Sequence, residues 1–240
     1  MPAPSHPLGS LLTSAARGIW PAADGSWTCL PPWRDGLGAV VCFTGYAVLV
    51  LPPASRNLSL DDLGIDGFGG ASSPRVVTAL ARGGWVDTLD VLLVRHGAAA
   101  PETLVANSAT SASHTSPVGA AEVDATDRGS LVLRPDLRDH PRARRARDLR
   151  TDVAVLGWPE LVRGDVVTLG RGIGGLLELS VESTDVGVGS GQRLVEAALR
   201  TVPAERVVVA AAAPGNARSL RMLLRAGFAP VGSVQLFLPR

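Results

Sequence analysis

A glycine-rich run near the C-terminal end, DVGVGSG over residues 185–191, stands directly before a segment with helical periodicity. Gly187, Gly189 and Gly191 allow a positive φ and carry no Cβ that would crowd a ligand. In residues 192–200 the apolar side chains recur at three- and four-residue spacing, which predicts a helix with one face packed on a sheet. Such a loop presents backbone N–H groups at the positive end of a helix dipole, so it either binds an anion or is an ordinary tight turn.

A second helix is predicted over residues 217–226, one strand later. Asn216 is placed to cap its first turn. Gly227 is expected to end it in the left-handed conformation, with Phe228 folding back onto the last turn. The residues expected on its buried face are Leu220, Leu223 and Leu224.

The order of predicted elements indicates the fold class. Three consecutive strands after residue 150 favour an antiparallel meander, and the later strand–helix–strand unit implies a parallel crossover. We therefore predict a mixed α/β (α+β) protein with a mostly antiparallel sheet flanked by helices. The strands are expected at residues 130–134, 152–156, 165–169, 176–181, 206–212 and 231–238, and the helices at 140–149, 192–200 and 217–226.

The N-terminal part is harder to interpret. Residues 1–35 show no clear period and are expected to be irregular, whereas residues 39–51 favour one bent strand or two short ones. Residues 74–82 predict a helix that begins with proline. Residues 86–94 fit either a buried strand or a short helix.

A segment dominated by Ala, Ser, Thr and Gly separates the two parts. It cannot bury enough apolar surface to offset its ordering entropy, so we expect a linker or a mobile insertion. The chain is therefore divided into an N-terminal α/β accessory region (1–97), a flexible linker (98–127) and a C-terminal domain (128–240). A glycine loop, helix and strand also follow one another in the first region, which is consistent with a degenerate copy of the C-terminal domain.

Composition excludes several classes of function. The formal net charge is +1, so the overall charge does not predict binding to nucleic acid or to a membrane surface. The four histidines and two cysteines show no metal-ligand spacing, and we expect neither a bound metal nor a disulfide framework. No signal peptide or membrane helix is expected, which favours the cytoplasm.

The glycine loop and the following helix together resemble the cofactor half of the GNAT acetyltransferase superfamily. The resemblance covers roughly the last 110 residues and is strongest over residues 176–228. It implies that acetyl-CoA is the co-substrate, with its pantetheine arm along the strand before the loop and its pyrophosphate on the loop. The residues that it implies for cofactor binding are Val181, Ser183, Val188, Gly189, Gly191, Gln192 and Asn216.

Two positions depart from that family's pattern. Val186 stands where the loop usually begins with Arg or Gln, and Leu223 stands where the family often has a tyrosine that protonates the leaving thiolate. The only tyrosine in the chain is Tyr46. Backbone groups make most of the cofactor contacts in such a loop, so Val186 is compatible with binding. Leu223 bears on catalysis, because it replaces the usual proton donor.

Transfer to an amine also needs a general base. Strand alternation places Glu178, Ser180 and Glu182 on one face of their strand. Glu178 is the first candidate for the base and Glu182 the second, and the alternative is a pair of carboxylates on a solvated sheet face.

Two further motifs are weaker. The GRGIGG run at residues 170–175 matches a dinucleotide fingerprint, but a strand follows it, so a hairpin turn is expected. The arginine-rich helix over residues 140–149 is expected to be a solvated surface, or else to bind a phosphate or an acidic partner.

Three functions remain open at this point. The first is an acyl-CoA-dependent N-acyltransferase that passes acetyl directly to an amine in a ternary complex. The second is an inactive acyl-CoA-binding sensor or scaffold, and the third is a structural module whose glycines are only turns. The acceptor, a small molecule or a peptide, and the oligomeric state are not indicated by the sequence.

Overall fold

The computed structural model describes residues 6–56, 58–99, 129–160, 164–185 and 189–240. Within these residues the helices pack on a single sheet, so the protein is mixed α/β. The α-helices are α1 (Pro7–Ala15), α2 (Pro74–Ala81), α4 (Pro141–Leu149), α5 (Ser190–Leu199) and α6 (Ala217–Arg225).

The sheet is largely antiparallel, and 11 strands of it lie in the described residues. They are β1 (Trp27–Leu30), β2 (Gly38–Phe43), β3 (Tyr46–Val50), β4 (Trp85–Val86), β5 (Asp90–His96), β6 (Val132–Leu133), β7 (Thr151–Gly157), β8 (Val166–Arg171), β9 (Leu177–Glu182), β10 (Val207–Ala212) and β11 (Ala229–Leu238). Their order is β1-β3-β2-β11-β5-β10-β9-β8-β7-β6, with β4 beside β11. Among the pairs formed by these strands, only β1–β3 and β9–β10 are parallel.

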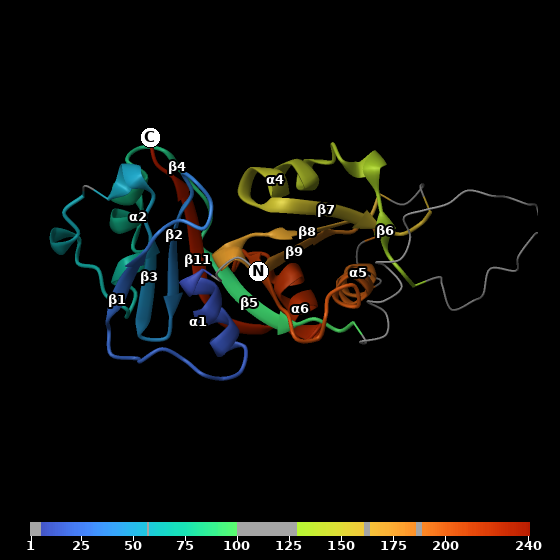
Figure 1. Cartoon of the computed structure of the whole chain (residues 1–240), viewed down its shortest axis with the longest axis horizontal. Helices are drawn as coiled ribbons and strands as arrows, with labels where there is room; N and C mark the ends of the chain where they lie inside the picture. Colours follow the sequence, from blue (N-terminus) through green and yellow to red (C-terminus); the bar gives the residue numbers. More distant parts are fainter. Residues whose placement is uncertain (1–5, 57, 100–128, 161–163, 186–188) are drawn as a thin grey trace, which may run out of the picture.

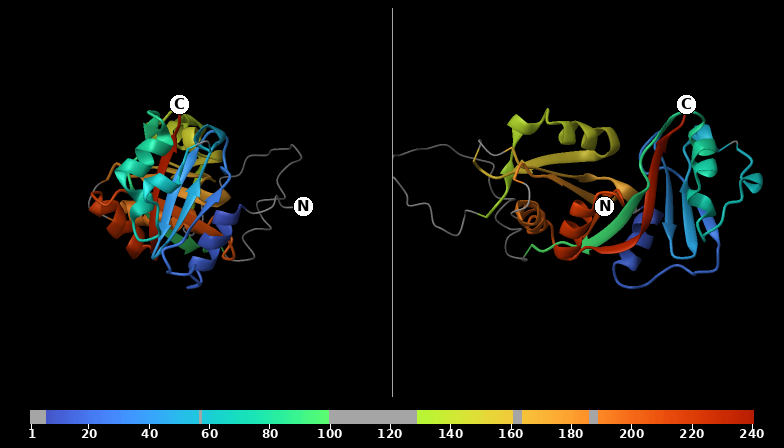
Figure 2. Two further views of the ribbon diagram at one scale, coloured as in Figure 1. Left: turned by 90° about the vertical axis from the view of Figure 1, so that its left-hand side faces the viewer. Right: turned by 180° about the vertical axis from the view of Figure 1, so that it is seen from behind.

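Strands β5 and β11 connect the two ends of the sheet. β5 is antiparallel to β10 on one side and to β11 on the other, and β11 continues to β2. Figure 2 shows the two strands side by side between the N-terminal and C-terminal parts. A strand from the first part of the chain therefore lies between two strands of the last part. The division at residues 1–97, 98–127 and 128–240 stays a prediction, and residues 100–128 lie outside the described part.

Helices cover both faces of the C-terminal strands (Figure 1). α4 packs against β7, β8 and β9 on one face, and α5 packs against β8 and β9 on the other, where α6 contacts β10. The predicted apolar face of α5 is confirmed, since Leu194, Val195, Ala198 and Leu199 are all buried. A core on the α5 side joins these residues to Leu179 of β9 and Val208 of β10.

The expectation that residues 1–35 are irregular was wrong. They contain helix α1 and strand β1. Leu8 and Leu12 of α1 are fully buried in the core formed with β2 and β5. His6 Nδ1 accepts a hydrogen bond from Leu8 N at 3.2 Å, and Pro7 occupies the first turn. A short helix that begins with proline and has few turns gives little periodicity to detect.

Other predictions for the first part are resolved by the structure. Residues 39–51 form two strands, β2 and β3, and residues 74–82 contain helix α2. The ambiguous segment 86–94 contains the end of β4 and the first part of β5, joined by residues 87–89. Its apolar run is continuous because β5 has a strand on each side.

Candidate functional site

The parallel strands β9 and β10 pair only where they begin. Leu177 pairs with Val208 and Glu178 with Val209, and the pairing then ends. Beyond this point β9 pairs only with β8, and β10 only with β5. The facing edges therefore carry backbone N–H and C=O groups with no strand partner. Such groups are satisfied by water or by an extended ligand that adds to the strand edge.

A cavity of about 220 Å³ lies between these diverging strands, and we call it the strand cavity. One wall is formed by Leu179, Ser180 and Val181 of β9, and the other by residues 210–213 at the end of β10. The remaining side is closed by Val195 of α5 and by α6. The α6 contribution consists of Asn216, Ser219, Met222 and Leu223.

Helix α5 begins beside this cavity. Gly189 precedes the helix with φ +75°, is exposed, and has open space where a Cβ would stand. A Cβ on Gly191 would come within 2.8 Å of Met222 Sδ, so this glycine brings α5 close to α6. The first N–H groups of a helix have no acceptor within the helix. The start of α5 therefore places such donors at an accessible surface beside the strand cavity.

Hydrogen bonds fix the described ends of the segment between β9 and α5. Ser183 Oγ donates to Ser190 Oγ at 2.7 Å, and Ser190 Oγ donates to the backbone oxygen of Asp185. Thr184 N donates to Asp165 Oδ1 at 2.9 Å. These bonds hold the start of the helix against the end of β9.

The residues that sequence reasoning assigned to the cofactor lie around this place, with one outside the described residues. Val181 and Asn216 line the strand cavity. Gly189 caps α5, and Gly191 and Gln192 lie in its first turn. Val188 falls in the gap at residues 186–188, together with Val186. Ser183 holds Ser190 as described above, and Gln192 Nε2 donates to Glu196 Oε1 at 2.9 Å.

Helix α6 has the predicted ends. Asn216 Oδ1 accepts from Ser219 N at 3.1 Å, which confirms the cap. Gly227 has φ +81°, and Phe228 is buried and donates its N–H to Leu223 O at 3.0 Å. The expected burial of Leu224 was wrong, because this side chain is 48% exposed. Of the three leucines only Leu223 is buried, and Leu220 is half-buried.

A second cavity of about 400 Å³ adjoins the first, on the α4 side of β9. We call it the carboxylate cavity. The residues that line both cavities are Thr88, Asp90, Arg142, Ser180 and Ala211. A ligand in the strand cavity would therefore meet a ligand in the carboxylate cavity near the middle of β9.

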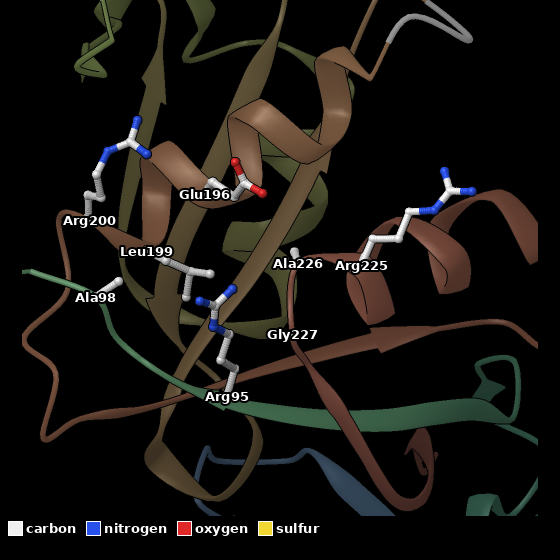
Figure 3. A pocket seen from close by; sticks show the side chains of 8 residues that line it. All are labelled: Arg95, Ala98, Glu196, Leu199, Arg200, Arg225, Ala226 and Gly227. Atoms are coloured by element: carbon white, nitrogen blue, oxygen red, sulfur yellow. The ribbon is translucent and has the colours of Figure 1, made fainter.

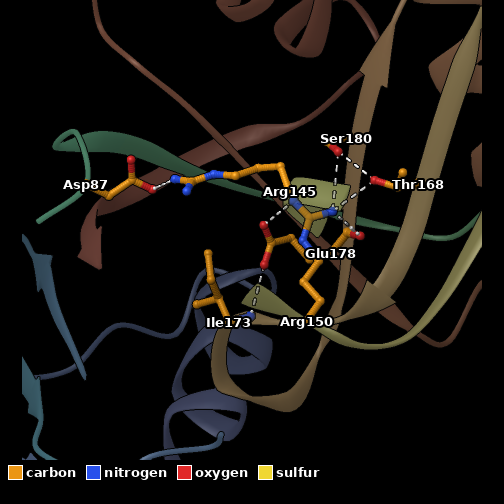
Figure 4. Close-up of polar contacts among 7 residues, drawn as sticks. All are labelled: Asp87, Arg145, Arg150, Thr168, Ile173, Glu178 and Ser180. Carbon is orange, nitrogen blue, oxygen red and sulfur yellow. Dashed lines mark hydrogen bonds and ion pairs between the residues drawn. The ribbon is translucent and has the colours of Figure 1, made fainter. Parts of the chain in front are cut away.

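Glu178, the first candidate for the base, is buried in an ion pair (Figure 4). Arg150 Nη2 lies 2.5 Å from its Oε1, and its Oε2 accepts from Ile173 N at 3.2 Å. Arg150 also donates to Thr168 Oγ1 at 3.1 Å. Both carboxylate oxygens of Glu178 are thus already engaged, although the side chain borders the carboxylate cavity.

Glu182, the second candidate, is nearer the surface and 48% exposed. Its Oε2 lies 3.0 Å from Nε of Arg142 on α4. Farther along α4, Arg145 pairs with Asp87 at 2.7 Å and stacks over Trp85. The arginine-rich helix is therefore neither simply solvated nor open to a phosphate at these positions, because its arginines neutralise carboxylates that border the carboxylate cavity.

Asp90 is a site residue that the sequence analysis missed. Burial raises the pKa of the Asp90 carboxyl, and the nearby charges of Asp87 and Glu178 add to this rise. A hydrogen bond from Thr88 and the positive charge of Arg145 oppose it. Thr88 Oγ1 donates to Asp90 Oδ1 at 2.7 Å. The available signal was an acidic residue at the start of an apolar run, but its position beside β9 depends on long-range pairing.

A third cavity of about 300 Å³ lies near the C-terminal end of α5 (Figure 3). Arg95, Arg200 and Arg225 line it together with Glu196. In Figure 3 the side chain of Arg225 points away from Arg95, and these guanidinium groups do not converge on one point. The C-terminal end of a helix also repels anions. This cavity is therefore a poorer place for a diphosphate than the start of α5.

The described residues contain no group of three or more His, Cys, Asp or Glu side chains arranged to hold a metal ion. No helix in the described ranges is long and apolar enough to cross a membrane. The GRGIGG run is a turn between the antiparallel strands β8 and β9, as expected. Comparison with protein-family models and with curated proteins gives no match for this chain.

Proposed function

We propose that this protein is an acyl-CoA-dependent N-acyltransferase of the GNAT type, which transfers acetyl from acetyl-CoA to an amine. The observation that carries the proposal is the divergence of β9 and β10 after two residue pairs, next to an accessible helix start. An extended pantetheine arm would add to the free edge of β9, and the diphosphate would meet the N–H groups of α5.

Each of the two cavities would hold one of the reactants. Acetyl-CoA would occupy the strand cavity, and the acceptor amine would enter the carboxylate cavity on the other side of β9. The amine then attacks the thioester carbonyl where the cavities meet, near Ser180. Holding both reactants in this geometry removes much of the entropic barrier of the bimolecular reaction. Backbone N–H groups on the free edge of β9 would stabilise the oxyanion.

An acyl-CoA-binding sensor or scaffold without turnover is the second candidate. It is favoured by Leu223, which lines the strand cavity from α6 and offers no proton to the leaving thiolate. The only tyrosine, Tyr46, lies on β3 in the N-terminal part of the sheet. Binding and catalysis must therefore be measured separately.

Calorimetry and a thiol-release assay on the full chain separate these functions. We expect acetyl-CoA to bind, and at 100 times its dissociation constant to stabilise the fold by about 2.7 kcal/mol. Release of CoA thiol in the presence of primary amines identifies the transferase, and binding without release identifies the sensor. If millimolar acetyl-CoA neither binds nor stabilises the protein, both proposals are wrong.

A further inference from the structure

Asp90 occupies the junction of the two cavities. It is the first residue of β5, opposite Val234 of β11, and it lines both the strand cavity and the carboxylate cavity. Its Oδ1 accepts the hydrogen bond from Thr88. No hydrogen bond from another described residue reaches its Oδ2, so this oxygen is free to receive a ligand.

Asp90 forms no ion pair with the described arginines around the carboxylate cavity, although the charge of Arg145 acts on it from its own pair with Asp87. Four carboxylates and three guanidinium groups border it, and the three arginines are each paired, at 2.5, 2.7 and 3.0 Å, with carboxylates other than Asp90. Within the described residues Asp90 therefore supplies one uncompensated negative charge. Asp90 is partly buried, and a partly buried carboxylate in this situation favours a cation. The paired groups are Arg142 with Glu182, Arg145 with Asp87, and Arg150 with Glu178.

Apolar side chains line one part of the carboxylate cavity, beside the ion pairs, Thr88 and Ser180. They come from Leu149 of α4, Ile173, Ala211 of β10, and Val234 and Leu236 of β11. Its volume, about 400 Å³, is in the range of small-molecule sites. A cavity that offers one carboxylate outside the ion pairs, together with apolar side chains, fits an ammonium group on an aliphatic stem.

We propose that Asp90 is the catalytic carboxylate of the acceptor site, which binds the ammonium group of a small aliphatic primary amine and takes the proton that this group loses. The proposal rests on the acyl transfer proposed above. It replaces Glu178 in the base role, because both oxygens of Glu178 already accept hydrogen bonds and Arg150 neutralises its charge. Glu178 becomes a residue that holds Arg150 and the turn at Ile173 in place.

The proposed acyl transfer takes two protons from the ammonium nitrogen. Asp90 takes one proton from the ammonium, and the freed lone pair attacks the thioester carbonyl carbon to form the C–N bond. The C–S bond then breaks, the sulfur leaves with its electron pair, and the second nitrogen proton neutralises it. The products are an amide, the CoA thiol and protonated Asp90, which returns its proton to water. The raised pKa of Asp90 makes it a stronger base than an ordinary carboxylate.

The test compares Asp90→Asn with Glu178→Gln and with Glu205→Gln, an exposed carboxylate outside the cavities. The probe amines are n-pentylamine and 1,5-diaminopentane, and n-pentanol serves as the uncharged control. The measurements are the acetyl-CoA dissociation constant, amine binding by calorimetry, and kcat/KM for thiol release as a function of pH.

We expect Asp90→Asn to lower kcat/KM by about 100-fold or more and to remove the fall of activity toward acidic pH. Its acetyl-CoA affinity should stay within about twofold of the wild type, since the free edge of β9 and the start of α5, which are proposed to bind the cofactor, are unchanged. Pentylamine but not pentanol should bind, and Asp90→Asn should abolish that binding. Glu205→Gln should match the wild type.

Two results overturn the proposal in distinguishable ways. If Asp90→Asn keeps the acidic limb and the wild-type rate, while Glu178→Gln loses both, Asp90 is not the base and the acyl transfer itself stands. If the wild type binds acetyl-CoA but transfers to no amine and binds no pentylamine, the transferase function fails and the role of Asp90 fails with it.

Discussion

Nη2 of Arg150 lies 2.5 Å from Oε1 of Glu178, and both side chains are only 9% exposed. The pair joins the residue just after α4 to β9. Glu178 belongs to the last residue pair between β9 and β10, after which the two strands separate. A buried pair of this kind contributes geometry more than net stability, because desolvation offsets much of the attraction. It fixes α4 on β9 and thereby forms one wall of the carboxylate cavity.

Removal of one partner should therefore be costly. Glu178→Gln leaves the Arg150 guanidinium buried without its counter-charge, and we expect the free energy of unfolding to fall by about 3–5 kcal/mol. Urea denaturation measures the loss. The double variant Arg150→Met/Glu178→Leu removes both charges and should recover most of the stability. A single variant as stable as the wild type would show that the pair does not form in solution.

The start of α5 can be tested with a matched pair of glycines. Gly189 and Gly36 have nearly equal φ values, +75° and +76°, and both have open space where a Cβ would stand. Valine at either position costs similar backbone strain, about 1–3 kcal/mol. We expect Gly189→Val to weaken acetyl-CoA binding at least about tenfold and Gly36→Val to leave the affinity unchanged. Equal affinities in calorimetry would remove the helix start from the binding site.

Leu223 offers a gain-of-function test. Its side chain lines the strand cavity, so a hydroxyl placed there could protonate the leaving thiolate. Leu223→Tyr should raise the rate of thiol release by about tenfold or more, whereas Leu223→Phe, with the same ring and no hydroxyl, should not. If the two variants release thiol at the same rate, no proton donor is missing at this position.

Asp90 should make stability depend on pH. Because burial raises its pKa in the folded state, the folded protein holds this proton more tightly than the unfolded chain does. That stabilisation is complete below the unfolded pKa, about 3.9, and is lost as the pH rises through the folded value. Asp90→Asn should therefore be more stable than the wild type at pH 7, and the difference should shrink toward pH 3. A variant less stable than the wild type at pH 7 would contradict this sign.

Local chemistry made the C-terminal elements predictable from the sequence. Asn216 and Gly227 mark the two ends of α6, and the apolar spacing of residues 194–199 marks the buried face of α5. These signals act within one or two turns of the residues that carry them. The expected antiparallel pairing of β7, β8 and β9 follows from short connections in the same way.

Long-range arrangement was not predictable. Nothing local in β5 indicates that it lies between β10 and β11, and only that placement brings Asp90 to the strand cavity. Similarly, Arg150 and Glu178 are 28 residues apart, and their pairing depends on how α4 packs. Helix α1 was missed because its burial comes from distant strands rather than from a strong periodicity of its own.

The most direct test of the central claim is a crystal structure of the full chain with acetyl-CoA. We predict the pantetheine arm in the strand cavity, paired with the free edge of β9 beside Val181, and the diphosphate on the N–H groups at Gly189–Gln192. A cofactor bound at saturation in another place, with the gap between β9 and β10 empty, would contradict the account.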